Sequence, residues 1–402
     1  MAGTDGTCEY VLDPDDPETW GGEEGQECLI DEELLNDDGV WSCPHEAEEG
    51  QELCIFHLPV DEKGDEEVVE AFLHSIENIA SNTQRQKSQF LAAKFGEFKL
   101  GEPEVEECQP DFSGAGTEVG ISMLYATVTG ELRWSELPFS ISCLCCAGVK
   151  FLNSVSLFEV DFRKRVDFSG VDFGEWVSFS GIEFGRQVDF SEAKFEGRAS
   201  FSQVEFGGLA DFSGAKFEER ADFGSVNFGR DARFSGVEFR GQTSFLIVNF
   251  TGQADFGSAE FEKEADFSYA NFRGKVTLRR VEFDEKINFR DAVFTYRADF
   301  TGRNLHDSQF NNADLTDVAF VDASLISANL ESALLKQATL LSADLRGAKL
   351  SGTVLRDVQI NQETQFLEYY PDDNDSSTHA ISAARSQPFC VYDPEYQGDN
   401  MH

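Results

Sequence analysis

Four cysteines and two histidines gather between Cys8 and His57, where they could bind a metal ion. Cys43 stands two residues before His45, and Cys54 stands three residues before His57. Thiolate and imidazole groups at such short separations are typical ligands of tetrahedral zinc. We therefore predict one structural zinc ion. Its predicted ligands are Cys8, Cys43, Cys54 and His57, with Cys28 as the alternative to Cys8 and His45 as a weaker candidate.

Two other interpretations of these cysteines stay open at this point. The thiols could be buried and reduced inside a small cap, with no metal ion. A disulfide is a weaker interpretation, because a reducing cytoplasm disfavours it. The segment is acidic and poor in apolar residues, so that a bound metal ion would help it to fold.

A second group of cysteines, Cys143, Cys145 and Cys146, lies further along the chain. The spacing of the repeat described below predicts that Cys143 and Cys145 point into the core. Two inward thiols and one outward thiol do not form a ligand set, so we expect no metal ion here.

A short repeat across residues 149–360 must supply the elements that position these residues. Each unit has a small or apolar residue two places before a central Phe or Leu, as in Val166-Asp167-Phe168. From Phe151 to Phe300 the spacing of the centres alternates between five and six residues, and after Phe300 it is five. Apolar residues separated by one polar residue indicate a short strand. A period of five suits neither a long helix nor a long strand, so we expect the chain to turn after every unit.

Such units bury their apolar side chains only by coiling and stacking on one another, at about 4.8 Å per coil. The repeat resembles that of the pentapeptide-repeat family, whose units read roughly Ala-Asp/Asn-Leu/Phe-x-x. The resemblance implies an all-β solenoid, a right-handed quadrilateral β-helix of pentapeptide repeats. With four units per coil, as the resemblance implies, equivalent positions are expected 22 apart before Phe300, with an extra residue bulging at a corner, and 20 apart after it.

The chain is predicted to have five parts. Apolar residues at helical spacing between Val68 and Ile79 indicate a short helix that caps the open end of the solenoid. The apolar stretch at residues 389–394 is expected to fold back on the last coil. The parts are an acidic Cys/His-rich segment (1–60), a capping-helix region (61–90), irregular early coils (91–148), the regular β-helix (149–360) and an acidic, partly disordered tail (361–402).

The chain is strongly acidic, with 75 acidic and 32 basic residues and a formal net charge of −43. Residues 1–149 hold 34 of the acidic and 6 of the basic residues. This excess indicates adaptation to a saline cytoplasm, and the sequence resembles acidic haloarchaeal pentapeptide-repeat proteins with a Cys-rich N-terminus. Direct binding of nucleic acid or of an anionic membrane is disfavoured, because both need clustered basic residues. The N-terminus is acidic and has no apolar signal sequence, so we expect a cytoplasmic protein.

Residues 22 positions apart are expected to stack on one wall of the solenoid. One such row carries carboxylates that could bind a basic partner or cations, unless it is only a solvated face. These residues are Asp167, Asp189, Asp211, Asp255 and Asp299.

No arrangement of residues typical of a catalytic site or of a phosphate-binding loop is recognisable. We therefore expect a non-enzymatic binding or scaffold protein that presents a rigid rod to an unidentified protein partner. A homodimer through one end of the rod is a further expectation. The family resemblance implies an alternative, because some members mimic duplex DNA and modulate type II topoisomerase.

Overall fold

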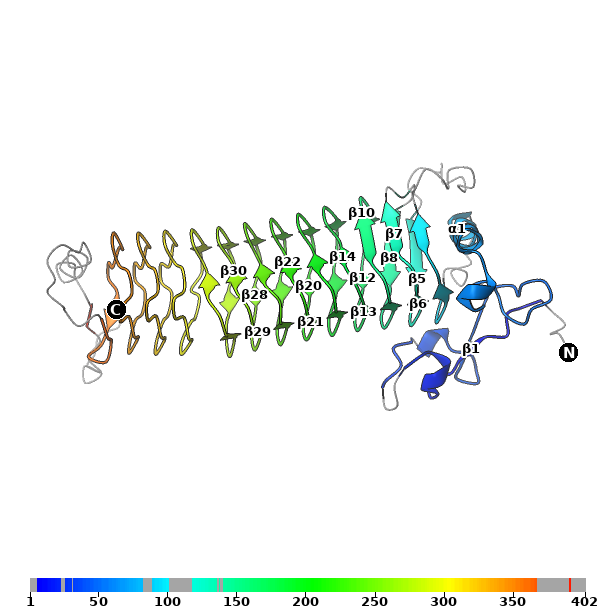
Figure 1. The fold of residues 1–402 in the computed structure, drawn as a ribbon, viewed down its shortest axis with the longest axis horizontal. Helices are drawn as coiled ribbons and strands as arrows, with labels where there is room; N and C mark the ends of the chain where they lie inside the picture. Colours follow the sequence, from blue (N-terminus) through cyan, green and yellow to red (C-terminus); the bar gives the residue numbers. More distant parts are fainter. Residues whose placement is uncertain are drawn as a thin grey trace, which may run out of the picture. The chain divides into compact units, whose positions relative to one another are not determined.

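The computed structural model describes residues 6–22, 26–30, 32–81, 89–100, 118–135, 137, 140–366 and 390–391. The chain divides into two compact units, residues 1–219 (unit 1) and residues 220–402 (unit 2). In both units short parallel strands stack coil upon coil (Figure 1). The expected all-β solenoid is therefore confirmed, together with one short helix.

Each full coil of unit 1 contributes one strand to each of four walls, which follow one another along the chain. Wall 1 holds β3 (Lys94–Phe95), β6 (Thr127–Val128), β9 (Lys150–Phe151), β13 (Asp172–Phe173), β17 (Lys194–Phe195) and β21 (Lys216–Phe217). Wall 2 holds β4 (Phe98–Leu100), β7 (Leu132–Ser135), β10 (Val155–Phe158), β14 (Val177–Ser178) and β18 (Ala199–Ser200). Wall 3 holds β11 (Asp161–Phe162), β15 (Glu183–Phe184) and β19 (Glu205–Phe206). Wall 4 holds β12 (Val166–Asp167), β16 (Val188–Asp189) and β20 (Ala210–Asp211). Walls 3 and 4 share β8 (Ser140–Cys145), on which β5 (Glu118–Ser122) pairs.

Unit 2 also has four walls, which follow one another along the chain in the same order. Wall 1 holds β25 (Glu238–Phe239), β29 (Glu260–Phe261) and β33 (Glu282–Phe283). Wall 2 holds β22 (Ala221–Asp222), β26 (Thr243–Ser244), β30 (Ala265–Asp266) and β34 (Ile287–Asn288). Wall 3 holds β23 (Asn227–Phe228), β27 (Asn249–Phe250), β31 (Asn271–Phe272) and β35 (Val293–Phe294). Wall 4 holds β24 (Ala232–Arg233), β28 (Ala254–Asp255) and β32 (Val276–Thr277).

The core consists of columns of phenylalanine rings. On one wall the rings of successive coils lie parallel, as in Phe195 and Phe217, whose centroids are 4.4 Å apart with 2° between their planes. Rings on different walls meet edge to face, as in Phe201 and Phe212, at 5.3 Å and 90°. Burying one such side chain stabilises the fold by about 1.5–3 kcal/mol, and a well-placed ring pair adds about 0.5–1.5 kcal/mol. The strict spacing of Phe in the sequence is therefore the packing pattern of the interior.

The corners explain the alternation between five and six residues. After walls 2 and 4 the chain turns at a residue with positive φ, such as Gly170 (60°) or Gly181 (74°). After walls 1 and 3 an extra residue makes the corner, as expected from the spacing. Beyond Phe300 every unit has five residues, and its corner again uses a positive φ, as at Asp307 (55°) and Asn312 (62°). Backbone bridges there join positions 20 apart, from Asp299 with Ala319 to Thr339 with Gln359, as the change of period predicts.

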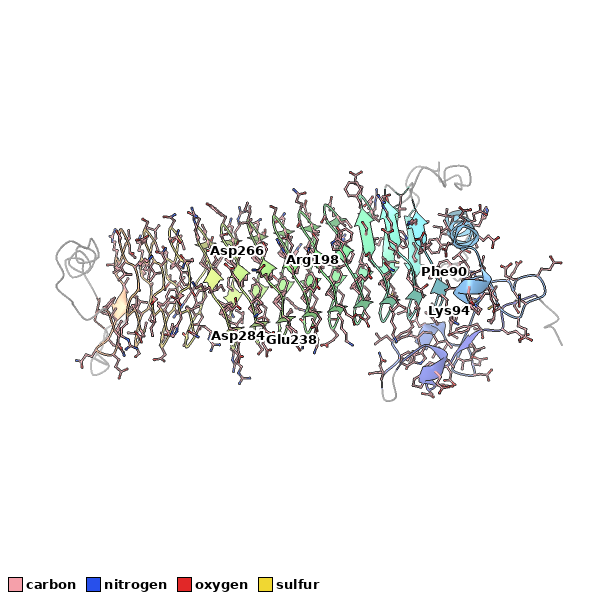
Figure 2. All side chains as sticks on the ribbon, viewed as in Figure 1. Phe90, Lys94, Arg198, Glu238, Asp266 and Asp284 are labelled. Carbon is pink, nitrogen blue, oxygen red and sulfur yellow. The ribbon has the colours of Figure 1, made fainter. Side chains whose placement is uncertain are left out.

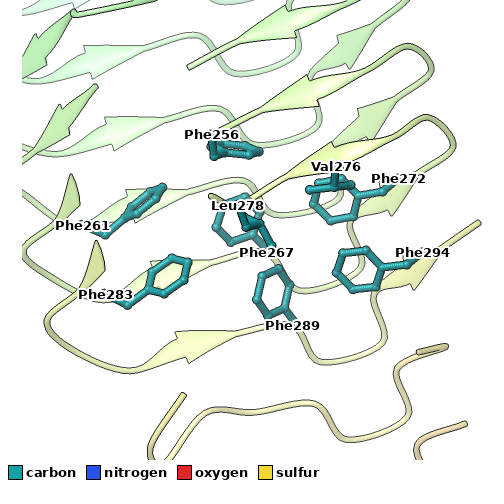
Figure 3. A pocket seen from close by; sticks show the side chains of 9 residues that line it. All are labelled: Phe256, Phe261, Phe267, Phe272, Val276, Leu278, Phe283, Phe289 and Phe294. Carbon is teal, nitrogen blue, oxygen red and sulfur yellow. The ribbon is translucent and has the colours of Figure 1, made fainter. Parts of the chain in front are cut away.

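Leu278 interrupts the phenylalanine column of wall 4 in unit 2. A leucine is shorter than the phenylalanine that it replaces, and an internal space of about 10 Å³ lies beside it (Figure 3). The lining is entirely apolar and consists of Phe256, Phe261, Phe267, Phe272, Val276, Leu278, Phe283, Phe289 and Phe294. A space of this size without polar groups does not hold an ordered water molecule.

The helix α1 (Asp65–Ser81) lies against the first strands of unit 1, close to β4 and β5. Its first turn carries Asp65, Glu66 and Glu67, which suits the positive end of the helix dipole. The ring of Phe72 contacts those of Phe90, at 4.6 Å, and Phe98, at 4.9 Å. The predicted helix is thus present and covers apolar side chains of the first coil. No helix in the described part of the chain is long and apolar enough to cross a membrane.

The N-terminal segment has little regular structure. It contains an antiparallel pair, β1 (Val11–Leu12) with β2 (Trp41–Ser42). It also contains three 3₁₀ helices, at Pro17–Thr19, Glu32–Leu34 and Val60–Glu62.

The predicted orientation of Cys143 and Cys145 is wrong. Leu144 pairs with Val166 and Cys145 pairs with Asp167, so that Cys146 occupies the central, inward position. Cys143 is exposed, Cys145 is half-buried and Cys146 is buried. The cause lies within β8, where Ile141 and Leu144 are three residues apart but align with Phe162 and Val166, which are four residues apart, so that the inward positions after Ile141 shift by one residue.

The end of the described solenoid carries one more strand pair. Strand β36 (Gln359–Ile360) pairs in parallel with β37 (Cys390–Val391). The expected return of this apolar stretch to the last coil is therefore confirmed for these two residues. Most of the tail at residues 361–402 lies outside the described residues.

Candidate metal centre

The four residues predicted first as zinc ligands come together in unit 1. One ligand atom from each of Cys8, Cys43, Cys54 and His57 lies within 4.8 Å of every other, and all four residues are buried. The Sγ atoms of Cys43 and Cys54 are 3.7 Å apart. The Nδ1 atom of His57 lies 3.6 Å from Sγ of Cys8 and 3.3 Å from Sγ of Cys54.

These distances match the edges of a tetrahedron around zinc. Zn–S bonds of about 2.3 Å and Zn–N bonds of about 2.0–2.1 Å at tetrahedral angles place two sulfur atoms about 3.8 Å apart. The same bonds place a sulfur and a nitrogen atom about 3.5 Å apart. The cluster is therefore large enough for the ion, and its donor set of three thiols and one imidazole is a known structural zinc set.

Local backbone structure explains how the ligands meet. The backbone N–H groups of His57 and Leu58 both donate to the carbonyl oxygen of Cys54, at 3.0 and 3.1 Å, which closes a turn around the C-x-x-H sequence. The other two thiols are brought together by antiparallel pairing. The N–H of Cys43 donates to the carbonyl of Tyr10 at 3.1 Å, and that of Cys8 donates to the carbonyl of His45 at 3.0 Å.

The ring of His57 is oriented by groups that the sequence did not indicate. Its Nε2 atom lies 2.9 Å from the carbonyl oxygen of Leu91, an acceptor that holds the proton on Nε2. Nδ1 is thereby left with its lone pair toward the three thiols, as metal-binding histidines require. The ring of Tyr10 stacks on the imidazole at 3.9 Å with 7° between the planes. Neither partner stands at a motif spacing from His57.

The electrostatics of the cluster favour a bound cation. Hydrogen bonds from the thiols of Cys43 and Cys54 lower the pKa of Cys8 below the ordinary range of a thiol. The pKa of Cys43 is raised, because the hydrogen bonds with Cys54 and Cys8 and its burial favour the protonated thiol. Three buried thiols this close cannot all ionise without positive charge between them. A divalent cation would supply that charge and release the remaining protons.

The two other N-terminal candidates lie outside the cluster. Cys28 is half-buried and lies beside Tyr125, whose hydroxyl accepts a hydrogen bond from the backbone N–H of Leu29. The imidazole of His45 packs against the rings of Phe56 and Phe90, and its Nε2 atom lies 3.1 Å from the carbonyl of Gln89. The fourth residue of the cluster is therefore Cys8 and not Cys28.

The carboxylates expected in one row do stack within unit 1. Asp167 pairs with Asp189, and Asp189 pairs with Asp211, at successive coils of wall 4. The Oδ1 atom of Asp189 accepts from the backbone N–H of Ser191 at 3.0 Å and from its hydroxyl at 2.6 Å. The same turn recurs at Asp167 and Asp211. These carboxylates therefore stabilise the corners of the solenoid, whatever else they bind.

Arginine partly neutralises this row. The guanidinium of Arg165 lies 3.0 Å from a carboxylate oxygen of Asp167 and 3.8 Å from one of Asp189. In unit 2, Asp255 and Asp299 make the same kind of turn, with the N–H groups of Gly257 and Thr301. There the neighbours of Asp255 on wall 4 are Arg233 and Thr277, so no continuous carboxylate row forms among the described residues of that wall.

Comparison with known families identifies the repeat. Residues 147–194 and 179–227 match a family model described as pentapeptide repeats (9 copies). Residues 287–331 and 319–357 match a second model, pentapeptide repeats (8 copies). These two regions of the chain therefore carry pentapeptide repeats, and the fold that they build is a parallel β-solenoid. No curated protein matches the sequence.

Solved structures that are similar to this chain include HetL and QnrB1. HetL from the cyanobacterium Nostoc sp. strain PCC 7120, a pentapeptide-repeat protein involved in regulating heterocyst differentiation, is 20% identical with a TM-score of 0.21. That alignment covers 48% of this chain and 87% of HetL. Full-length QnrB1, a plasmid-mediated fluoroquinolone resistance protein, is 16% identical with a TM-score of 0.26, over 54% of this chain and 94% of QnrB1.

Proposed function

We propose that this protein is a non-enzymatic binding scaffold whose solenoid presents rigid walls to a protein partner. The observation that carries the proposal is the filled interior. Among the described residues, the space beside Leu278 is only about 10 Å³, so the coils offer other molecules their outer surface. Repeat solenoids stacked in this way are stiff and display long regular surfaces, which suits protein recognition.

The N-terminal cluster has a structural part in this proposal. One zinc ion held by Cys8, Cys43, Cys54 and His57 would connect β1, β2 and the turn at residues 54–57. Residues 6–22 hold only one short strand and one short 3₁₀ helix, and buried side chains such as Leu12 and Trp20 also hold this segment in place. The fit of the ligand distances to a tetrahedral site supports the proposal, and metal binding would contribute directly to the folding free energy of this segment.

The aspartate row of unit 1 is a candidate contact for a basic partner or for cations. Asp167, Asp189 and Asp211 place one carboxylate at each coil, and the second oxygen of each is not used by the serine turn. Asp255 and Asp299 extend the proposal to unit 2. The pairing of Arg165 with the row shows that a guanidinium fits between two successive carboxylates.

We also propose a cellular compartment and an oligomeric state for the protein. A chain with a net charge of −43 stays soluble in a saline cytoplasm, where its thiols remain reduced and available to a metal ion. A homodimer formed through one end of the solenoid is part of the same proposal, because an open coil edge presents unpaired backbone groups.

Affinity capture from a lysate of the source cells, kept at the salt concentration of their cytoplasm, tests the proposed scaffold function. The full-length protein and a variant with several charge reversals on the walls are used as paired baits. A specific protein retained by the first bait and lost with the second supports a binding role for the walls. If no protein is retained above the level of an unrelated acidic bait, the proposal is wrong.

A second candidate function is modulation of a type II topoisomerase by mimicry of duplex DNA. The acidic row of unit 1 favours it, since it repeats one carboxylate per coil. The basic side chains on unit 2 argue against it. A supercoiling assay with micromolar protein at native salt separates the two candidates, because mimicry requires inhibition or protection of the enzyme.

A further inference from the structure

On wall 3 of unit 2, the outward residues of the last three described strands are uncharged, although the chain as a whole is strongly acidic. They are Asn249, Asn271 and Val293. We define the wall 3 surface as these residues together with eight exposed side chains from the two corners that flank them. The corner that enters the wall contributes Leu246, Ile247 and Tyr269, and the corner that leads to wall 4 contributes Thr251, Arg273, Lys275, Tyr296 and Arg297.

The basic residues of this surface form no ion pair within the described part of the chain. Elsewhere in unit 2, Arg240, Lys263 and Arg290 each pair with a carboxylate of the chain, at 2.7, 3.1 and 3.0 Å. The last of these pairs joins Arg290 to Asp291 at the entering corner, so this carboxylate is already neutralised.

The opposite side of unit 2 is acidic, and Glu238 and Asp284 lie along one edge of it (Figure 2). In contrast, Arg273, Lys275 and Arg297 are exposed and have no ion-pair partner within the described part of the chain. Three positive charges are therefore available to a partner on this side.

The entering corner exposes apolar side chains at a cost in stability. Ile247 is 56% exposed and Tyr269 is 50% exposed, and they stand at equivalent positions of successive coils, with φ of 59° and 58°. The other described coils place Gly or a polar residue at this position, as in Gly181, Ser225 and Asp291. Ile247 is the one β-branched residue with positive φ among the described residues, and a β-branched side chain is strongly disfavoured there.

The combination fits a protein interface better than a solvated face. Aromatic residues and arginine dominate the binding energy of protein interfaces, and charged residues other than arginine are depleted at interface centres. Tyr296, which is 62% exposed, adds a second aromatic anchor beside Arg297. Strained backbone that exposes an apolar residue has no benefit for the isolated solenoid, and such strain is concentrated at functional positions.

We infer that the wall 3 surface docks a partner protein that presents carboxylates beside an apolar side chain. The carboxylates would pair with Arg273, Lys275 and Arg297, and the apolar group would cover Ile247 and Tyr269. Nucleic acid fits less well, because three basic residues beside an apolar corner make a poor track for a phosphate backbone. This inference rests on the proposed scaffold function and names the surface and the chemistry of its partner.

The test uses full-length protein with a photoreactive benzoylphenylalanine at one of two exposed positions. Thr251 lies on the wall 3 surface, and Gln242 lies at the corner between walls 1 and 2 as the control. After capture in lysate and illumination, mass spectrometry identifies the cross-linked peptides. We expect cross-links from Thr251 and none from Gln242, to a partner segment rich in Asp and Glu.

A charge-reversal pair completes the experiment. Arg273→Glu, Lys275→Glu and Arg297→Glu together should weaken retention of the cross-linked partner at least tenfold. The matched control, Arg240→Glu, Lys263→Glu and Lys286→Glu, makes the same change of charge on the opposite side and should alter retention less than twofold.

The outcomes separate this inference from the proposed function. The assignment of the wall 3 surface as the docking site is wrong if the retained partner cross-links from Gln242, or if its contacting segment is basic. Either result leaves the proposed scaffold function unaffected. Retention that disappears after nuclease treatment assigns the surface to nucleic acid and also overturns the inference. If neither bait retains a partner, both proposals are wrong.

Discussion

The Sγ atom of Cys54 lies 3.3 Å from the Nδ1 atom of His57, three residues further along the chain. This contact joins a short sequence motif to the remainder of the N-terminal segment, because Cys8 and Cys43 reach the same point from other parts of the chain. A metal ion at this point would connect three separate stretches of backbone.

We predict that the purified protein contains one zinc ion per chain. His57→Gln should remove most of the bound metal and lower the melting temperature, since a ligand set of three thiols holds zinc less tightly than the complete set. Metal content by atomic emission and thermal unfolding with and without a chelator give the result. Cys28→Ser and Cys143→Ser are the controls, as neither residue lies in the cluster, and equal metal loss in a control would contradict the assignment.

Replacing Leu278 with phenylalanine should stabilise the solenoid. The larger side chain would fill the apolar space on wall 4 and continue the ring column, with an expected gain of about 1 kcal/mol in the free energy of unfolding. Leu278→Ala enlarges the same space and should cost about 2–5 kcal/mol. Urea unfolding curves measure both changes. A loss of stability in Leu278→Phe would mean that the surrounding rings cannot admit the extra atoms.

The aspartate row can be tested by two substitutions with different effects. Asp189→Ala removes the acceptor for the N–H and hydroxyl of Ser191 and should cost about 1 kcal/mol. Asp189→Asn keeps an oxygen acceptor at that place, so that stability should change little. If the row binds a basic partner or cations, Asp189→Asn with Asp211→Asn should still weaken that binding. Unchanged binding and unchanged cation dependence would leave these residues only their role in the turns.

Replacing Ile247 should separate stability from binding. Ile247→Asn places a residue that tolerates positive φ at the strained corner, so the free energy of unfolding should rise by about 1 kcal/mol. The same substitution removes an apolar contact of the wall 3 surface and should reduce partner retention. Ser258→Asn, at another corner with a φ of 57°, is the control and should alter neither property. A gain in stability without loss of retention would remove Ile247 from the docking surface.

The half-buried side chain of Lys63 predicts a dependence of stability on pH. Burial lowers its pKa to about 8, although its ammonium group donates to the carbonyls of Ile55 and Lys94, both at 2.6 Å. Between pH 8 and the ordinary pKa of 10.5, the unfolded chain binds more protons at this site than the folded chain does. The contribution of Lys63 to stability should therefore increase as the pH rises through this window.

Comparison with Lys63→Met isolates that contribution from the other groups that titrate there. The difference in free energy of unfolding between the wild type and this variant should shift in favour of the wild type from pH 8 to pH 10. A difference that stays constant would show that folding does not change the pKa of Lys63, and a shift the other way would show that folding raises it.

Sequence alone was enough for the architecture, because a repeat of five or six residues admits few ways to bury its apolar positions. The spacing of Phe predicted a turn after every unit and the shorter units that follow Phe300, and the resemblance to pentapeptide-repeat proteins implied the four walls. The apolar periodicity between Val68 and Ile79 predicted the helix. The C-x-x-H spacing predicted one half of the metal cluster, since a single turn brings those side chains together.

Only the tertiary structure decided which cysteine completes the cluster and which way Cys143 points. Cys8 and Cys28 are equivalent in sequence terms, and the choice between them depends on the antiparallel pairing of β1 with β2, which lie far apart along the chain. The corner within β8 is one residue shorter than the equivalent corner of the next coil, which turned Cys143 outward, and no local pattern revealed this.

The wall 3 surface was equally hidden, because it combines side chains from successive coils, such as Ile247 and Tyr269. In the sequence these residues are separated by many others, whereas the stacking of coils places them side by side. That is the physical reason why such a surface cannot be recognised before the fold is known.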